Sequence, residues 1–349
     1  MVIPSWEDAF ENSELGDRRR IKRAIRIANQ IEKKYNKRGA SAALSGHSDL
    51  KAASRLLKST KVSAERLTEG FIKMNCERIT APHVLIIEDT SEFNFAWRKK
   101  EINGLGPTGN GEDQGFFLHP AILVDADTEE MQGLAGLQII TRQYGQATTK
   151  GEVHKYKDIS AKESYRWLEV PRRGAGQLSE TTKKTIIGDR EADIYDLFLS
   201  QHTGALGGNC ELLIRASRDR KIQGTHEYLF AEVESWEVKG CHIVEVAANK
   251  KRSARSAQCE IRCGTVTFEV PRTQRNRKER IAIPDVTVID LREKNYPEGE
   301  EPLHWMLLTT WPVENIEQAI EKVRWYRCRW LIEELFRILK SGYHVESIR

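Results

Sequence analysis

The segment KTIIGDREADIYDLFLSQHTGALGGNCELLIRAS, residues 184–217, passes from a strand pattern to a helix pattern and back to a strand pattern. Its two ends are short apolar runs without helical periodicity, whereas ADIYDLFLSQ in the middle is typical of a helix. Three earlier apolar runs, joined by polar connections, predict a β-meander: HVLIIEDT (83–90), GFFLHPAILVDAD (115–127) and MQGLAGLQIITRQY (131–144). Strands followed by alternating helix and strand predict an α/β fold with a mixed sheet.

The first 75 residues differ from this pattern and predict a small all-α domain. Asp17 is expected to cap a helix that begins RRRIKRAIRIANQIEKK, and further helices are expected at about 48–58 and 63–78. This part of the chain holds 16 Lys and Arg against 9 Asp and Glu, although the net charge of the whole chain is only +4. Basic charge gathered at one end favours a polyanionic partner such as nucleic acid, and a solvated helix face is the alternative.

Residues 220–300 interrupt the alternation of strand and helix with short β patterns. Two basic runs, NKKRSAR at 249–255 and RTQRNRKER at 272–280, are expected to form hairpin tips between those strands. WMLLTTWPV at 305–313 predicts one more strand, and a closing helix is expected to begin near Ile316.

Composition excludes several classes of protein. The 349 residues are 39% hydrophobic and 30% charged, as in globular proteins of two or three domains. No apolar run approaches the ~20 residues that span a bilayer, and the N-terminus lacks the features of a signal peptide, so a cytoplasmic protein without a membrane partner is expected. Six scattered cysteines argue against a disulfide framework, and the spacing of Cys259 and Cys263 is too loose to favour zinc.

Two expected strands end in a carboxylate. Asp89 follows the run HVLIIE, and Asp189 follows KTIIG. Ligands of open α/β sheets bind at the carboxyl ends of strands, which makes both residues candidates for a site. Glu88 must point to the opposite face from Asp89. A turn residue or a helix cap is the alternative for each aspartate.

A polar stripe runs along the closing helix YRCRWLIEELFRILK, residues 326–340. At about 100° per residue, its four members fall within an arc of roughly 60°. Bulky apolar residues, Trp330 among them, are expected to cover much of the remaining circumference. The stripe therefore indicates a site for an anionic ligand, with a structural row of ion pairs as the alternative. Its members are Tyr326, Arg329, Glu333 and Lys340.

The three carboxylates together point to metal-dependent chemistry. Asp89, Asp189 and Glu333 would supply only oxygen ligands, which suit Mg²⁺ or Mn²⁺ rather than zinc. Two such ions a few ångströms apart can stabilise both the attacking and the leaving oxygen of a phosphoryl transfer.

These blocks resemble a known family, the DDE transposases of bacterial insertion sequences. The spacing Y-x2-R-x3-E-x6-K matches the YREK signature of the insertion-sequence-four class, and the surrounding CRWLIEELF is similar to the Tn-five transposase-like branch of that class. Four other blocks carry the resemblance along nearly the whole chain: LGDRRRIKR (15–23), IIEDTSEF (86–93), GDREADIYD (188–196) and PLHWMLLTTWPVE (302–314).

The resemblance implies an RNase H-like core with a β-rich insertion at about 220–300. It implies a division into a DNA-end-binding domain at 1–75 and a catalytic core at 76–349. It assigns Asp89, Asp189 and Glu333 to the triad that binds two divalent ions, and it places Trp305 on a flipped base. The other implied DNA contacts are Tyr326, Arg329, Arg337, Lys340, Arg215, Arg19, Arg20, Arg23 and Lys58.

The implied activity is cut-and-paste transposition of double-stranded DNA, from inverted-repeat ends into target DNA near the nucleoid. Metal-activated water would cut one strand, the freed 3′-hydroxyl would form a hairpin, and a later step would join the ends to the target. The family's C-terminal dimerisation domain is absent before Arg349, so self-association on DNA would need another surface. A truncated, non-catalytic DNA-binding regulator and an RNase H-like structure-selective nuclease are the alternatives.

Overall fold

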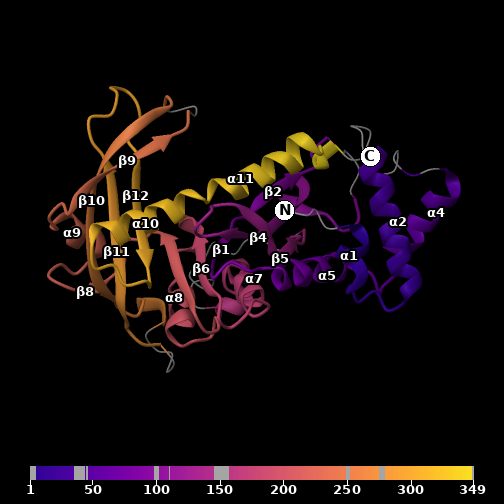
Figure 1. Cartoon of the computed structure of the whole chain (residues 1–349), viewed down its shortest axis with the longest axis horizontal. Helices are drawn as coiled ribbons and strands as arrows, with labels where there is room; N and C mark the ends of the chain where they lie inside the picture. The colour runs from indigo at the N-terminus through magenta and orange to yellow at the C-terminus, as the bar shows by residue number, and fades with distance from the viewer. Residues whose placement is uncertain are drawn as a thin grey trace.

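A single large mixed sheet organises the described part of the chain (Figure 1). The computed structural model describes residues 5–34, 44, 46–97, 102–109, 111–144, 157–248, 252–274 and 280–347. Within them the sheet has 12 strands in the order β2–β4–β1–β6–β7–β12–β11–β10–β8, with β3 and β5 paired to β4 and β9 paired to β10. The strands β1 to β6 are His83–Glu88, Ser91–Asn94, Gly106–Thr108, Asp113–Asp125, Met131–Ile140 and Lys183–Gly188. The strands β7 to β12 are Cys210–Arg215, Ile222–Gln223, Gly240–Val246, Arg255–Phe268, Ile283–Glu293 and His304–Thr309.

The strand order β5–β4–β1–β6–β7 gives the core an RNase H-like arrangement. β4 is antiparallel to β1 and to β5, which confirms the predicted meander, with the short strands β2 and β3 as additions that the sequence did not predict. β6 is parallel to β1 and β7 is parallel to β6. The helix α8 (Tyr195–His202) connects β6 to β7. The predicted mixed α/β sheet is therefore confirmed.

Two hydrophobic cores lie on opposite faces of the sheet. Along β1, Val84 and Ile86 belong to one core, whereas Leu85 and Ile87 belong to the other, because successive side chains of a strand alternate between faces. The first core is covered by α5 (Ala64–Glu77), α7 (Arg166–Ala175), α8 and α9 (Leu229–Glu234). The second is covered by α10 (Ile316–Arg327) and α11 (Trp330–Arg337). A central strand buried on both faces explains the continuous apolar run HVLII.

The N-terminal helices are α1 (Trp6–Glu11), α2 (Arg18–Lys34), α4 (His47–Leu57) and α5. The Asp17 carboxylate accepts a hydrogen bond from the Arg19 N–H at 2.8 Å, as predicted for a cap of α2. Leu15, Ala24 and Leu56 form a small core of their own, but Ile72 and Cys76 of α5 belong to the core beneath the sheet. The helix α5 thus attaches the N-terminal helices to the sheet. Figure 1 shows α2 and α4 at one end of the molecule.

The β-rich part extends the same sheet, because β12 pairs with β7. The two basic runs do lie between paired strands, β9–β10 and β10–β11, although residues 249–251 and 275–279 lie outside the described residues. The last residue of each run, however, is not part of a hairpin tip but is paired with acidic side chains of the fold. Arg255 is in β10 and pairs with Glu293 and Glu300, and Arg280 pairs with the buried Asp196.

The closing helix differs from the single helix that the sequence predicted. A turn at Cys328 and Arg329 separates α10 from α11, and a π-helical turn at Ile338–Gly342 follows α11. The Trp330 side chain, which was expected to be packed, is 55% exposed. All six cysteines are free, and no helix among the described residues is long and apolar enough to cross a membrane.

A buried ion pair joins the β-rich part to the loop after β6. The Arg220 guanidinium pairs with Asp193, which is fully buried, and lies 4.3 Å from the centre of the Phe268 ring. Asp193 also accepts hydrogen bonds from the Ser217 and Arg218 N–H groups. Removing the cation would leave a buried carboxylate without its counter-charge.

We predict that Arg220→Met lowers the free energy of unfolding by about 3 kcal/mol, because Met keeps the volume but not the charge. Urea unfolding followed by circular dichroism measures the change. Arg172→Met is the control, since Arg172 makes an exposed pair with Glu169, worth less than about 1 kcal/mol. Equal losses in the two variants would contradict the structural role of the buried pair.

Candidate active site and nucleic-acid interface

Asp89 and Asp189 directly follow two neighbouring strands. β1 and β6 pair in parallel with Ile87 opposite Ile187, and each aspartate is the first residue after the end of its strand. Adjacent strands are about 4.8 Å apart, which brings the two aspartates to one edge of the sheet. Glu88 is fully buried on the opposite face, as expected, where its carboxylate lies 3.1 Å from His119 Nε2.

Asp89 is held in a partly buried, negatively charged environment. Its Oδ1 accepts a hydrogen bond from the Thr90 N–H at 2.7 Å, and its Oδ2 accepts one from Arg329 Nη1 at 3.3 Å. Burial raises the pKa of Asp89 to about 6, and the carboxylates of Asp189 and Glu333 act in the same direction. The Thr90 amide and the Arg329 guanidinium oppose that shift. Asp89 therefore interacts electrostatically with both of the other acids of the predicted triad.

Asp189 and Glu333 are presented by different local structures. Asp189 caps the short helical turn Arg190–Ala192, and its Oδ1 accepts the Glu191 N–H at 2.8 Å. Glu333 lies in the first turn of α11, is 58% exposed and pairs with Arg329 four residues earlier. Arg329 thus bridges Asp89 of the strand end and Glu333 of the predicted stripe, which accounts for a base one helical turn before the acid of that stripe.

A divalent ion fits the chemistry of these residues. The donors are carboxylate oxygens alone, which Mg²⁺ and Mn²⁺ prefer. Burial and the neighbouring Asp189 carboxylate raise the pKa of Asp89 even though the Arg329 guanidinium lies beside it. Within the described ranges, however, no three His, Cys, Asp or Glu side chains are already drawn together as a metal cluster.

The aromatic and basic residues of the predicted DNA contact lie beside these acids. The Tyr326 ring is 3% exposed and meets the Trp305 ring edge-on, with 5.2 Å between the centroids. Arg215 donates a hydrogen bond to the His304 carbonyl at 2.8 Å and interacts electrostatically with Tyr326. Burial lowers the pKa of Arg215 and raises that of Tyr326. The structure therefore brings Trp305, Tyr326 and Arg215 together. Tyr326, which was expected to contact DNA, is almost completely buried.

The remaining predicted contacts lie elsewhere. Arg337 is exposed and pairs with Glu334, and the Lys340 ammonium lies 5.2 Å from the centre of the Phe93 ring on β2. On α2, Arg19 and Arg23 are exposed, whereas Arg20 donates to the Leu15 carbonyl at 2.9 Å. Lys58 is exposed at the end of α4.

An open groove lies on the N-terminal helices. It runs along α1 and α2, beside the face that holds Arg19 and Arg23, and its basic lining residues are Arg18, Lys22, Arg26 and Lys33. Basic charge on more than one face of α2 supports the expectation of a polyanionic partner for this helix.

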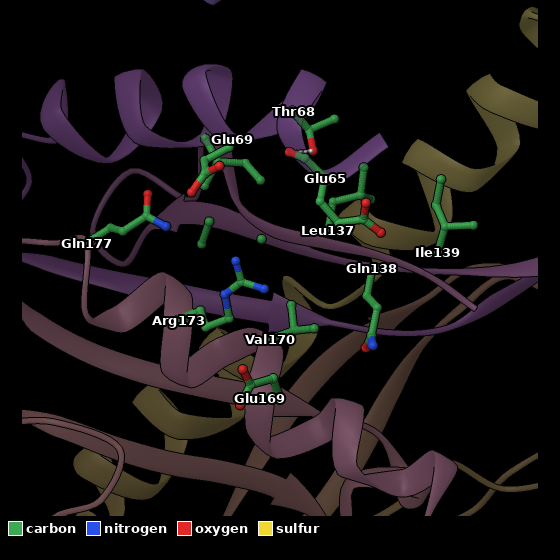
Figure 2. Close-up of a pocket in the computed structure, with 13 residues that line it drawn as sticks. Glu65, Thr68, Glu69, Leu137, Gln138, Ile139, Glu169, Val170, Arg173 and Gln177 are labelled. Atoms are coloured by element: carbon green, nitrogen blue, oxygen red, sulfur yellow. Dashed lines mark hydrogen bonds between the residues drawn. The ribbon is translucent and has the colours of Figure 1, made fainter. Parts of the chain in front are cut away.

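A second cavity, of about 140 Å³, lies between α5, β5 and α7 (Figure 2). Glu65, Glu69 and Glu169 line it together with Arg173. None of the three acids of the predicted triad lines it, so this cavity is separate from the strand ends.

Sequence reasoning missed a set of polar residues directly behind the strand ends. Thr90, His119 and Arg166 form a hydrogen-bonded chain that connects the loops after β1 and β6. A histidine inside the apolar run GFFLHPAILV was one available signal, since a buried polar group needs a partner. Arg166 gave no signal, because an arginine at the start of a charged helix is ordinary.

Comparison with known proteins gives matches to two family models along the chain and to solved structures. Residues 5–62 match a family model described as "Transposase DNA-binding", and residues 171–349 match one described as "Transposase DDE domain". One similar solved structure is a piggyBac transposase synaptic complex with hairpin DNA, determined by cryo-EM. It has 9% sequence identity and a TM-score of 0.36, and the match covers 83% of this chain and 47% of that chain. The chain thus spans about half the length of that protein. Because the catalytic-domain model covers more than half of its residues, this chain belongs to the DDE transposase domain family.

Proposed function

We propose that the protein is a cut-and-paste transposase of the YREK class that cleaves and joins DNA at the inverted-repeat ends of its own element. The observation that carries this proposal is the edge of the sheet where Asp89 interacts with Asp189 and Glu333, and where Arg329 pairs with Asp89 and Glu333. The spacing of Tyr326, Arg329, Glu333 and Lys340 supports the class. Residues 1–75 would bind the ends, and the remainder would form the catalytic core.

The three acids would hold two Mg²⁺ or Mn²⁺ ions, which would supply an activated hydroxyl and stabilise charge on the transferred phosphoryl group. The chain's own residues then have distinct tasks. The parallel strands hold Asp89 and Asp189 at a fixed spacing, and Arg329 orients Glu333 toward them. Trp305, which packs edge-on against the buried Tyr326, would offer the aromatic face on which an unstacked base recovers its stacking.

Metal dependence is tested by Asp189→Asn. The amide oxygen can still accept the Glu191 N–H, so the cap is kept, but the charge that would bind the ion is lost. We expect Mg²⁺-dependent cleavage of a duplex carrying the repeats that flank the gene to fall at least 100-fold, with duplex affinity unchanged within about twofold. Gel analysis of the products and fluorescence anisotropy measure the two quantities.

Glu334→Gln serves as the control, because Glu334 neighbours Glu333 on α11 but pairs with Arg337. It should cleave at the rate of the unaltered protein. Cleavage by Asp189→Asn at an undiminished rate would remove Asp189 from the proposed triad. If Asp189→Asn no longer bound the duplex, Asp189 would be needed for the fold rather than for binding the metal.

The pH dependence of stability provides a second test. The pKa of Asp89 is about 6 in the folded protein against an ordinary value of 3.8 for an aspartate, so the unfolded chain binds fewer protons between these values. Ionised Asp89 therefore lowers stability as pH rises from about 4 to 6. With a chelator present, Asp89→Asn should raise the free energy of unfolding by about 1–2 kcal/mol at pH 7 and leave it unchanged near pH 4.

Urea unfolding at the two pH values measures this gain. The exposed Asp127, on the turn after β4, provides the control variant Asp127→Asn, which should change stability by less than about 0.5 kcal/mol at both. A loss of stability in Asp89→Asn at pH 7 would show that the carboxylate serves the fold rather than a ligand.

Salt dependence tests the proposed end-binding role of α2. Arg19→Gln combined with Arg23→Gln removes two exposed charges and leaves Arg20 in its bond to Leu15. If both arginines contact phosphates, the slope of log affinity against log salt should become shallower by about 1.8, or 0.9 per contact. Anisotropy titrations between about 50 and 200 mM salt measure it.

The matched control combines Arg172→Gln with Lys183→Gln, two exposed positions away from α2. This variant should keep the original slope. An identical slope in the α2 variant and in the unaltered protein would mean that this face of α2 is simply solvated.

A further inference from the structure

Arg166 connects the two loops that follow the strands carrying Asp89 and Asp189. It is the first residue of α7, and its side chain is only 12% exposed. Its Nε donates to Thr90 Oγ1 and its Nη2 donates to Glu191 Oε2, both at 2.9 Å. Its Nη1 donates to the Glu163 carbonyl, also at 2.9 Å. All three nitrogens of the guanidinium are therefore engaged by the protein.

The partners of Arg166 are the residues that hold the two aspartates. The Thr90 N–H donates to Asp89 Oδ1 at 2.7 Å, and the Glu191 N–H donates to Asp189 Oδ1 at 2.8 Å. One guanidinium thus reaches each aspartate through a single intervening residue. A shift of Arg166 would move both carboxylates, because each is fixed by a backbone amide of the residue that Arg166 contacts.

Buried groups fix this connection from behind. His119 Nδ1 lies 2.9 Å from Thr90 Oγ1, and its Nε2 lies 3.1 Å from Glu88. The His119 ring packs edge-on against Trp167, which is 1% exposed and follows Arg166 on α7. Arg142 forms a bidentate pair with the carboxylate of Glu163, whose carbonyl accepts from Arg166. The Arg166 guanidinium extends from the first residue of α7, which the buried Trp167 holds in place, and therefore has little freedom to move.

Direct contact with DNA is a poor explanation for Arg166. A phosphate-binding arginine presents its donors to solvent, whereas these donors face Thr90, Glu163 and Glu191. The small cavity beside them, of about 200 Å³, is also lined by Glu92, Glu163 and Glu191, which would repel an anion.

We propose that Arg166 is a positioning residue that sets the spacing of Asp89 and Asp189 and thereby the affinity of the site for divalent ions. The inference rests on the proposed function, because it assumes that these aspartates bind the metal. Partners of metal-binding carboxylates typically change metal affinity by 10–100-fold when they are replaced. Arg166 acts here without touching metal or substrate.

The test is a direct binding measurement: Mn²⁺ binding to the full chain followed by electron paramagnetic resonance, with thermal unfolding in chelator alongside. Arg166→Met should weaken Mn²⁺ binding at least 10-fold. Arg166→Lys keeps the positive charge but cannot make all the hydrogen bonds of the planar guanidinium, so it should weaken Mn²⁺ binding by a smaller factor. Arg172→Met, on the same helix with an exposed partner, should bind Mn²⁺ like the unaltered protein.

Glu191→Gln keeps the test decisive if Arg166→Met does not fold. The Glu191 side chain is 63% exposed, so its replacement by Gln removes the charge that pairs with Arg166 without disturbing the core. It should weaken Mn²⁺ binding several-fold. A variant with lowered thermal stability but unchanged Mn²⁺ affinity would overturn the proposal, because a merely structural arginine predicts that result.

The outcome also separates this inference from the proposed function. If the unaltered protein binds Mn²⁺, Asp189→Asn does not, and all the Arg166 and Glu191 variants bind normally, the metal site stands and the positioning role fails. If neither the unaltered protein nor Asp189→Asn binds Mn²⁺, both the proposed metal site and the positioning role of Arg166 fail.

Discussion

The parallel pairing of β1 with β6 is the constraint on which the rest of the site depends. Both strands are almost completely buried, so their register is fixed by apolar side chains on two faces, and a slip of one residue would exchange those faces. With Ile87 opposite Ile187, the chain leaves both strands at the same level and places an aspartate on each. The geometry of the acids is thus decided by hydrophobic packing some distance from them.

The second half of the site depends on how the C-terminal helices cross the sheet. Ala319 and Val323 of α10 and Ile332 of α11 are buried against the face opposite α7 and α8. The turn at Cys328 and Arg329 lies where this helix pair passes the strand ends. Arg329 consequently reaches Asp89, while Glu333 one turn later stays more than half exposed.

Much of this fold could be predicted from sequence, because the strands are apolar runs with unambiguous limits. Asp17 as a cap and the alternating faces of β1 also followed from local rules. The break at Cys328 could not be predicted, since no Gly or Pro marks it and both helices continue the apolar pattern. Trp330 was misplaced because a large apolar residue in an apolar pattern was expected to pack, whereas its side chain is 55% exposed.

The candidate site was predictable to the same extent. Asp89, Asp189 and Glu333 could be nominated from strand ends and from helical spacing, but Arg166 could not, because its partners lie 76 and 25 residues away along the chain. The same limit applies to Tyr326, whose burial beneath Trp305 depends on how β12 meets α10. Long-range polar contacts leave no periodic trace in a sequence.

The acids of the site differ in how firmly they are held, and that difference has a chemical consequence. Asp89 and Asp189 end rigid, buried strands and are tied to backbone amides, so they cannot approach a ligand by rotating freely. Glu333 is an exposed helical side chain whose one described partner is Arg329. In the proposed metal site, two fixed acids would keep a set spacing while the third, adjustable acid closes around substrate and ion together. Arg329, which is hydrogen-bonded to Asp89 and Glu333, would link that movement to the fixed pair.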